Sequence, residues 1–171
     1  RRISQLNFEN VGINADQIVA TGDEAEQLIK DAINYGTLCV SAEAVGCMES
    51  CYLKTVEYTK SREQFGQPIS NFQVLQHKMV DMFIEAELCK SLLYKSMIDM
   101  HENNDSKYRS VSALKSQVGL SGKKVGEDAV QLHGGMGVSE EMSIGHYLKR
   151  FISIDSQFGN SHFHLKKFNN S

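Results

Sequence analysis

Apolar residues recur at helical spacing along most of the chain. No proline occurs between Thr21 and Ser61, and the apolar positions there go nearly all the way round a helix: Leu28, Ile29, Ile33, Leu38, Val40, Val45, Met48, Leu53 and Val56. This pattern is typical of a helix that neighbours contact on several sides. The sequence therefore predicts a central helix of about 35 residues, roughly 50 Å long.

Later segments show the narrower spacing of bundle helices. Apolar residues step by three and four over 72–100, with Asn71 as the expected N-cap, and again from Asp105 or Ser106 to Leu132. Gly134 to Gly137 should stop that third helix. A short segment at 139–147 and a last helix over 149–168, interrupted by Gly159, complete an all-α, antiparallel four-helix bundle over 21–171.

At the start of the chain, apolar residues recur mostly at every second position rather than every third or fourth. Residues 6–13 alternate apolar and polar side chains and end in the turn-like Asn14-Ala15-Asp16, which predicts one short strand. No later segment offers a partner strand, so this strand either packs on the helices or is the edge of a sheet that belongs to another domain. The second alternative would make this chain a fragment of a longer protein, which we expect.

Composition narrows the functional classes. The chain has 171 residues, a net charge of -3 and 41% hydrophobic residues, as expected for one soluble domain. Nucleic-acid binding would need clustered Lys and Arg, and a membrane span or signal peptide would need a long apolar run. Neither pattern is visible, so a cytoplasmic location is predicted.

Metal chemistry has little support in the residue spacing. None of the six histidines follows a glutamate by three positions, as a di-iron bundle would require. His162 and His164 are two apart on an expected helix and should point to different sides. Cys39, Cys47, Cys51 and Cys89 fall in apolar helical stretches and are expected to be free, buried thiols.

The richest segment is 61–73, which joins the first two long helices and contains Pro68, the only proline. Arg62 would lie near a helix C-terminus, where the dipole stabilises a cation. Alternatively, Arg62 pairs with a phosphate group, while Phe65 packs on a flat ring and Gln73 forms a hydrogen bond with it. Composition alone leaves both readings open.

A second segment, Gln131-Leu132-His133-Gly134-Gly135-Met136-Gly137, is rich in glycine. Its glycines would let a ligand approach the backbone closely, although a helix C-cap explains them equally simply. His133 and the later His146 are expected to be structural, because nothing nearby gives them a proton to move.

Together the two segments resemble a known family. Arg-x-x-Phe-Gly-x-x-Ile-x-x-Phe-Gln between two long helices, followed about sixty residues later by Gln-Leu-His-Gly-Gly-x-Gly and Glu140-Glu141, is similar to the C-terminal helical domain of the acyl-CoA dehydrogenases. The resemblance implies that residues 1–20 are the remnant of that family's middle β-domain and its linker, with the strand at 6–13 as the closing strand. It also implies that the N-terminal helical domain and most of the β-domain are missing.

The resemblance also implies an FAD site at a subunit boundary. By position, Arg62 would contact the pyrophosphate of a neighbouring subunit's FAD, and Phe65 would lie against its adenosine half. Gln73 would meet the adenine side. Gln131 and Gly135 would meet the same ADP portion. All five positions carry the family's residues.

The catalytic base of the family is not found. Members remove the α-proton of an acyl-CoA with a glutamate near the last helix, which corresponds to Phe158 here, or on the first long helix, which corresponds to Gly36. Glu43 and Asp155 lie two turns and one turn from these positions and are weak substitutes, more simply explained as partners of a nearby Lys or Arg.

Residues 146–165 narrow the resemblance further. His146-Tyr147-Leu148-Lys149-Arg150-Phe151 and the segment from Phe158 to Leu165 look like the small-subunit branch of heteromeric acyl-CoA dehydrogenases, of the pimeloyl-CoA dehydrogenase type. The implied partners are an acyl-CoA substrate, a homo- or hetero-tetramer of dehydrogenase subunits and an electron-transferring flavoprotein. The alternative is a non-catalytic structural partner subunit.

Overall fold

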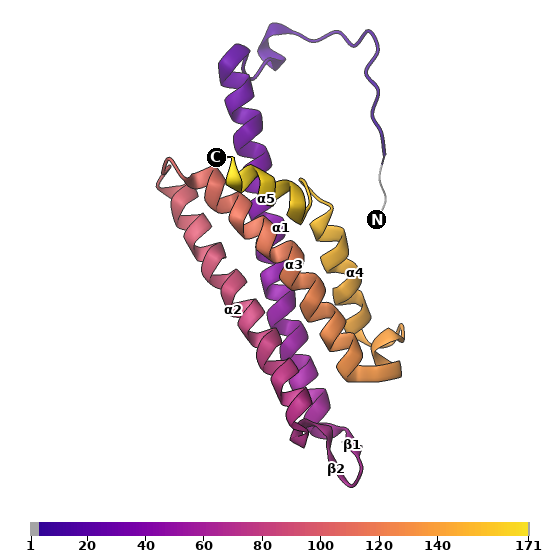
Figure 1. Ribbon diagram of the computed structural model, residues 1–171. Helices are drawn as coiled ribbons and strands as arrows, with labels where there is room; N and C mark the ends of the chain where they lie inside the picture. Colours follow the sequence, from indigo (N-terminus) through magenta and orange to yellow (C-terminus); the bar gives the residue numbers. More distant parts are fainter. Residues whose placement is uncertain (1–3, 171) are drawn as a thin grey trace. The chain divides into compact units, whose positions relative to one another are not determined.

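The computed structural model describes residues 4–170, most of which are helical (Figure 1). The elements in chain order are η1 (Ala15–Gln17), α1 (Gly22–Ser61), β1 (Glu63–Gln64), β2 (Gln67–Pro68), η2 (Ile69–Asn71), α2 (Gln73–His101), α3 (Lys107–His133), η3 (Gly134–Val138), α4 (Ser143–Asp155) and α5 (Ser161–Asn169). Backbone contacts divide the chain between Ile33 and Asn34 into two compact units, which are described separately.

The first unit contains the predicted strand, and that prediction is wrong. Residues 5–14 form no strand, and their apolar side chains are exposed, Leu6 by 75% and Phe8 by 78%. A single extended segment has no partner for ladder hydrogen bonds, so alternation of side chains cannot by itself make a strand. A short 3-10 helix, η1, follows and is closed by a hydrogen bond from Asn14 N to Gln17 Oε1 (2.7 Å). The predicted domain boundary near residue 20 stays a prediction.

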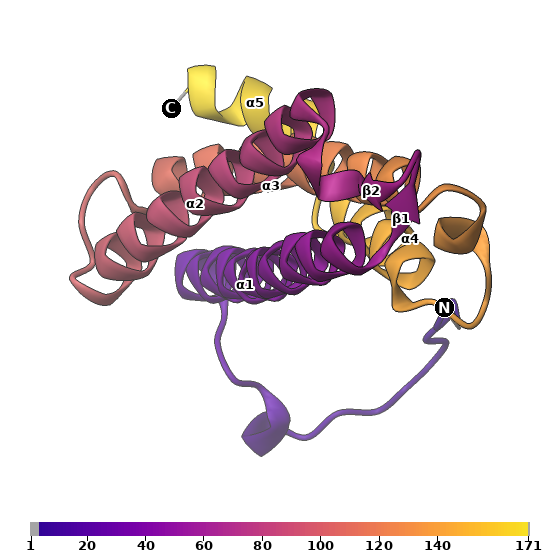
Figure 2. The same ribbon diagram turned by 90° about the horizontal axis from the view of Figure 1, so that it is seen from below.

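The second unit is the predicted helical bundle, which confirms the all-α fold class. Figures 1 and 2 show α3 lying between α2 and α4, with α5 across its end, and α3 packs against all three of these helices. The buried side chains form one core cluster: Ala44, Val45, Met48, Cys51, Met82, Ala86, Cys89, Leu93, Leu114, Val118, Val125, Ala129, Leu132, Ile144, Phe151 and Ile154.

The central helix of this unit is α3 rather than the first long helix. From Asn34 onward, α1 buries a single stripe of residues, and Leu53, which the sequence pattern places on a contacted side, is 50% exposed. Apolar residues all round α1 were expected to be covered by neighbouring helices. From Asn34 onward one broad face is covered, which includes the partly buried Leu38 and Val40. Apolar side chains outside this face, such as Leu53, remain exposed.

Two details of the helix ends differ from expectation. Asn71 does not cap α2, because it lies inside the 3-10 turn η2, and Phe72 holds the N-cap position without a side-chain hydrogen bond. The expected last helix is two helices, separated by the turn 156–160. Phe158 (φ 56°) and Gly159 (φ 101°) both adopt left-handed conformations there, which a continuous helix cannot contain. Asn160 caps α5 by accepting from Phe163 N (2.9 Å).

Glycines on α3 allow α4 to approach closely. A Cβ atom added at Gly122 would lie 3.1 Å from Phe151 Cδ1, and one added at Gly126 would lie 3.2 Å from the backbone Cα of Leu148. Protein interiors are packed so tightly that one extra carbon atom at such a contact displaces its neighbours and lowers stability. The glycines therefore set the spacing of the two helices.

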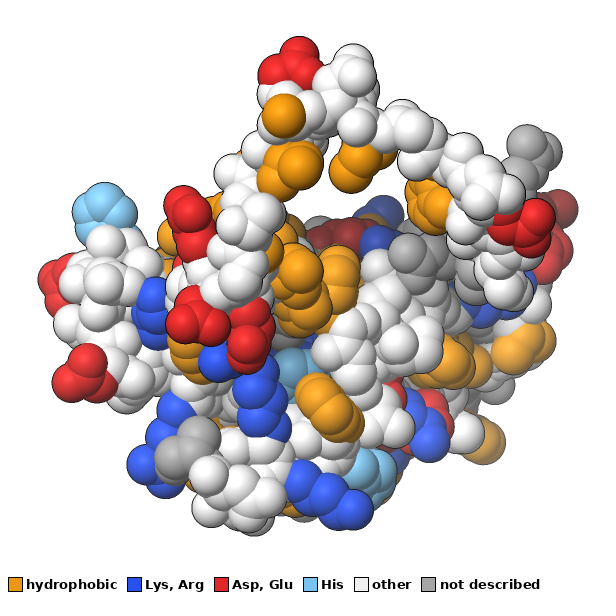
Figure 3. Space-filling model, turned by 90° about the horizontal axis from the view of Figure 1, so that it is seen from above, with side chains coloured by type: hydrophobic (Ala, Val, Ile, Leu, Met, Phe, Trp, Pro, Cys, Tyr) orange, Lys and Arg blue, Asp and Glu red, His pale blue; other side chains and the backbone are white. Residues whose placement is uncertain are grey.

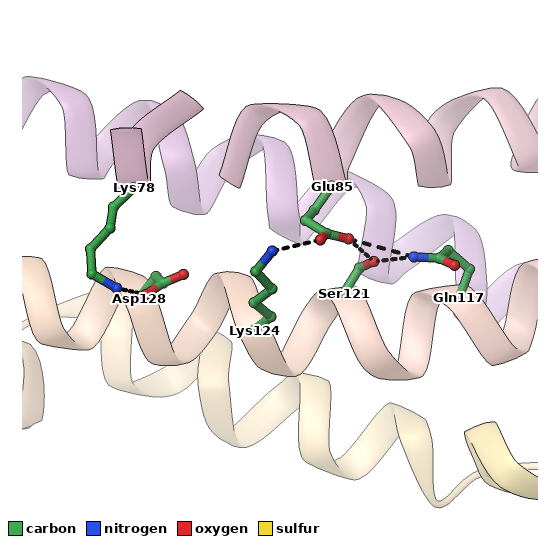
Figure 4. A network of polar contacts seen from close by, with 6 residues as sticks. All are labelled: Lys78, Glu85, Gln117, Ser121, Lys124 and Asp128. Carbon is green, nitrogen blue, oxygen red and sulfur yellow. Dashed lines mark hydrogen bonds and ion pairs between the residues drawn. The ribbon is translucent and has the colours of Figure 1, made fainter. Parts of the chain in front are cut away.

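Polar side chains join α2 to α3 along one edge (Figure 4). Lys78 pairs with Asp128, and Glu85 accepts hydrogen bonds from Ser121 Oγ (2.5 Å) and Lys124 Nζ (2.8 Å). Burial raises the pKa of Glu85, but the hydrogen bonds from Lys124 and Ser121 outweigh it and hold the pKa below its usual value. Glu85 is therefore a charged tie between the helices.

Asp99 organises the turn between α2 and α3. Its carboxylate is almost fully buried and accepts from Lys95 Nζ (2.8 Å), Asn104 Nδ2 (3.1 Å) and Ser110 Oγ. Hydrogen bonds from Lys95, Ser110 and Asn104 lower the pKa of Asp99 to about 2. Asp99 therefore binds a proton less readily in the folded protein than in the unfolded chain. Its ionised carboxylate stabilises the fold fully above the unfolded pKa, and this stabilisation disappears as the pH falls toward about 2.

Asp99→Asn is expected to lower the stability of the protein at pH 7 by about 1 kcal/mol, because the charged acceptor is lost. The difference from the wild type should shrink as the pH falls below about 4 toward 2, because the wild-type carboxylate then becomes protonated. Urea unfolding across this range measures the effect. Asp105→Asn, which changes an exposed carboxylate in the same loop, is the control and should show no such convergence.

The surface carries charges of both signs. On the face drawn in Figure 3, acidic and basic side chains lie among hydrophobic ones. None of the helices formed by residues 4–170 has the length and apolar character that crossing a membrane would require.

Candidate functional site

The turn between α1 and α2 is a tight hairpin that presents Phe65. Glu63 pairs with Pro68 and Gln64 with Gln67, and Phe65 (φ 55°) and Gly66 (φ 77°) form the two-residue tip in left-handed conformations. Positive φ at both positions is the geometry of a type I′ turn, which is unusual for phenylalanine. The ring of Phe65 is 91% exposed. The ring meets that of Phe72 edge to face (centroids 6.1 Å apart), a contact that leaves most of Phe65 exposed on a strained turn.

Arg62 lies at the base of the same hairpin. Its backbone N donates to Tyr58 O (2.9 Å), and its carbonyl accepts from Ile69 N (2.8 Å), so the hairpin is closed around it. Its side chain is exposed and forms no ion pair with another described residue. Gln73, the first residue of α2, is also exposed. The hairpin and the start of α2 therefore expose a cation, an aromatic ring and an amide.

The glycine-rich end of α3 lies near the last turn of α1. Gly134 (φ 60°) ends the helix, and Gln131 and Gly135 are exposed, with no heavy atom within 4 Å of a Cβ added at Gly135. The ring of Tyr58 stacks on that of His133 with centroids 4.2 Å apart, and its hydroxyl donates to His133 O (3.4 Å). This contact links the end of α1, which leads into the hairpin, to the glycine-rich segment.

His133 itself is buried. Its Nδ1 donates to Ala129 O (2.8 Å), which fixes the tautomer, and burial lowers the pKa of the imidazole, so the ring is held neutral. His146 Nε2 donates to Glu140 O (3.3 Å) at the surface. Both histidines thus have backbone partners.

The structure brings Gly36 and Phe158 together. A Cβ atom added at Gly36 would lie 2.7 Å from Phe158 Cζ, so the ring of Phe158 rests directly on the backbone of α1. Phe158 remains 45% exposed on its other side. The two positions that the resemblance assigns to the catalytic base are therefore one place in space, and a phenyl ring fills it.

Both nearby carboxylates are engaged. Glu43 receives two hydrogen bonds from Arg150, from Nε and from Nη2, each 2.5 Å, and these lower the pKa of Glu43. Asp155 Oδ1 accepts from Ser161 N (2.9 Å) at the start of α5. Each carboxylate therefore has a structural partner in the chain.

Sequence reasoning missed Lys115, whose side chain is completely buried. Its Nζ donates to Asp155 O (2.9 Å) and Gly159 O (2.8 Å), on either side of Phe158. The signal was present, because Lys115 is four residues after buried Val111 and three before buried Val118, on the apolar face of α3.

The cysteines differ in their surroundings. All four are free thiols, of which Cys51 and Cys89 are buried and Cys39 is exposed, so the expectation of burial is wrong for Cys39. Burial raises the pKa of Cys51 to about 12 and that of Cys89 to about 11. Among residues 4–170, no group of three or more His, Cys, Asp and Glu side chains has the arrangement of a metal site.

Comparison with known proteins places these features in a family. Residues 27–166 match the family described as "Acyl-CoA dehydrogenase, C-terminal domain". The short-chain-specific acyl-CoA dehydrogenase of Megasphaera elsdenii is 29% identical over 147 residues, which cover 85% of this chain and 38% of that protein.

Two solved structures share the fold. The butyryl-CoA dehydrogenase of Megasphaera elsdenii has a TM-score of 0.90 at 25% identity, covering 95% of this chain and 42% of that one. PigA, solved with FAD and proline, has a TM-score of 0.89 at 23% identity, with 95% and 42% coverage. The chain spans about two fifths of the length of these proteins. It belongs to the acyl-CoA dehydrogenase family and corresponds to the C-terminal domain of its members.

Proposed function

We propose that this chain is the C-terminal domain of an FAD-dependent acyl-CoA dehydrogenase subunit that completes an FAD site at a subunit interface and lacks the usual catalytic glutamate. The observation that carries the proposal is the outward hairpin, which presents exposed Arg62 beside exposed Phe65. No described residue forms an ion pair with the arginine, and the ring meets the edge of Phe72 (centroids 6.1 Å apart) but stays 91% exposed, so both are available to another molecule.

The residues at this end of the bundle suit the ADP half of FAD. Arg62 can donate to pyrophosphate oxygens, Phe65 can pack against the adenosine half and Gln73 can hydrogen-bond the adenine. Gln131 and Gly135 offer an amide and an open backbone for the same portion. When bound, the flavin would accept the β-hydrogen of an acyl-CoA as hydride.

The length of α1 supports an interface site. Gly36 precedes Arg62 on the same chain by about 26 residues, which is about 39 Å of helix axis. One dinucleotide is too short to contact the hairpin while its reactive ring lies beside Gly36 and Phe158. The two ends of the domain would therefore serve two different FAD molecules, each shared with another subunit.

The place beside Gly36 and Phe158 offers no base. Neither residue carries a carboxylate, and Glu43 and Asp155 are held by Arg150 and by the backbone of Ser161. Proton removal from an acyl-CoA would then depend on a second chain, as in a heteromeric dehydrogenase. The filled place equally favours the second candidate function, a non-catalytic structural partner subunit.

Exposed apolar residues on α2 support assembly with other dehydrogenase subunits as a homo- or hetero-tetramer. Val80, Phe83, Ile84 and Leu88 are each about half exposed, from 46% to 53%. A contiguous apolar helix face of this kind is typical of a protein interface. An electron-transferring flavoprotein remains the proposed electron acceptor.

Anaerobic titration of the full-length, FAD-replete protein with a panel of acyl-CoA thioesters tests the function. We expect the flavin to stay oxidised with this protein alone and to bleach once a homologous subunit with the glutamate is added. Bleaching by the protein alone would show that a base is present and contradict the proposal. Oxidised flavin in both experiments would favour the structural partner.

Arg62→Ala is expected to reduce FAD retention about tenfold to a hundredfold, because a charge-assisted hydrogen bond contributes about 1.5–3 kcal/mol. The measurement is the flavin-to-protein absorbance ratio after gel filtration of the full-length protein. Lys60→Ala removes an exposed cation two residues away, which pairs with Glu57 (3.3 Å), and should leave the ratio unchanged. Equal flavin loss in both variants, or in neither, would contradict a specific role for Arg62.

A further inference from the structure

Lys115 is a buried cation without an evident role in packing. It is the largest fully buried side chain among residues 4–170, and both hydrogen-bond partners of its ammonium group are backbone carbonyls rather than carboxylates. Burying an ammonium group is costly even when it is hydrogen-bonded, and an apolar side chain of similar volume would fill the same space. What an apolar side chain could not supply is the pair of donors.

Those donors hold the turn between α4 and α5 at two points. Lys115 Nζ donates to Asp155 O (2.9 Å) and to Gly159 O (2.8 Å). His164 Nε2 donates to the carbonyl that lies between them in sequence, Phe158 O (3.0 Å). The turn contains two consecutive left-handed residues, a conformation that persists only where surrounding contacts determine it.

The held backbone determines where the side chain at 158 lies. The carbonyls that Lys115 binds flank Phe158, whose ring rests against Gly36. We infer that Lys115 is a positioning residue, which fixes the α4–α5 turn so that the side chain at position 158 lies over Gly36. That this place is the site of the catalytic base rests on the proposed function, whereas the positioning of side chain 158 by Lys115 does not.

The test measures the surroundings of the ring at position 158 rather than enzyme activity. 4-Fluorophenylalanine is incorporated at position 158 of the full-length protein, and its ¹⁹F resonance is recorded with and without a soluble gadolinium chelate. Lys115→Met keeps the apolar stem and removes both donors. The control, Lys124→Met, removes a cation of the same helix that binds Glu85 on α2 and has no contact with the turn.

We expect Lys115→Met to move the ¹⁹F resonance by more than its line width and to increase its broadening by gadolinium, because the ring leaves Gly36. Lys124→Met should leave both unchanged. An unshifted resonance with unchanged broadening in folded Lys115→Met would overturn the inference. If that variant does not fold, Lys115→Gln, which keeps an N–H donor for one carbonyl, decides by the same two criteria.

A second readout separates this inference from the proposed function. In the background of Phe158→Glu, Lys115→Met should reduce the rate of flavin bleaching by acyl-CoA more than Lys124→Met does. If no bleaching occurs in any of these proteins while the ¹⁹F resonance responds to Lys115→Met, the positioning role stands and the proposed base site fails. If bleaching occurs and both lysine variants slow it equally, Lys115 has no special role in positioning.

Discussion

Gly119→Ala is expected to lower the unfolding free energy of the protein by about 2 kcal/mol, although alanine favours a helix over glycine by about 1 kcal/mol. A Cβ atom at this position would overlap Asp155 Oδ1 and would lie 2.9 Å from Ser161 Cβ and 3.1 Å from Asp155 Cγ. Real Cβ atoms do not make contacts this close, so part of the structure must shift.

The shift would break a specific hydrogen bond. Asp155 Oδ1 accepts from Ser161 N at the start of α5, and the same residue's carbonyl accepts from Lys115. Moving Asp155 away from an alanine at 119 would leave the backbone N–H of Ser161 without its acceptor. The cost is therefore that of overpacking together with a lost hydrogen bond.

Gly46→Ala is the matched control for this experiment. Gly46 lies in the interior of α1, is exposed, and has no heavy atom within 4 Å of an added Cβ. That variant should be slightly more stable than the wild type, by about 0.5–1 kcal/mol, because only the helix propensity changes. Thermal unfolding measures the difference in stability between the two variants. Equal melting temperatures for Gly119→Ala and Gly46→Ala would show that Asp155 and Ser161 do not lie close to Gly119.

The helices were predictable because their signal is local. The apolar spacing predicts one buried face of α2. Most of its members are buried or partly buried in the structure, whereas Met97, which belongs to the same predicted stripe, is 48% exposed. Apolar periodicity needs no knowledge of the partner helix. The same reasoning failed for residues 6–13, because a strand depends on hydrogen bonds to a second segment that the local pattern does not contain.

The geometry of the site was not predictable in the same way. Phe65 and Arg62 could be assigned from their motif, but the type I′ tip that exposes the ring is a backbone conformation that phenylalanine rarely adopts. The contact between Gly36 and Phe158 joins residues from opposite ends of the bundle's sequence, and Lys115 acts through carbonyl groups that any residue possesses. Such contacts arise from tertiary packing and leave almost no mark in a single sequence.

Phe158→Glu is expected to make the full-length, FAD-replete protein reactive toward acyl-CoA. A glutamate at this position would start from a backbone already held by Lys115 and His164, and Gly36 leaves room beside it because it has no Cβ. A correctly placed general base contributes about 10² to 10⁴ in rate. Anaerobic mixing with an acyl-CoA thioester should therefore bleach the flavin at least about a hundredfold faster than in the wild type.

Gly36→Glu is the informative comparison, because it adds the same carboxylate from the other side of the contact. Its Cβ would lie 2.7 Å from Phe158 Cζ, so the single variant should be destabilised and should not bleach the flavin. Combining it with Phe158→Gly removes the ring and should restore both stability and reactivity. Two results together would contradict this prediction: Phe158→Glu retains FAD and binds acyl-CoA but its flavin stays oxidised, and the double variant is no more stable than Gly36→Glu. The phenyl ring would then not occupy the place of the base, and the chain's lack of reactivity would have another cause.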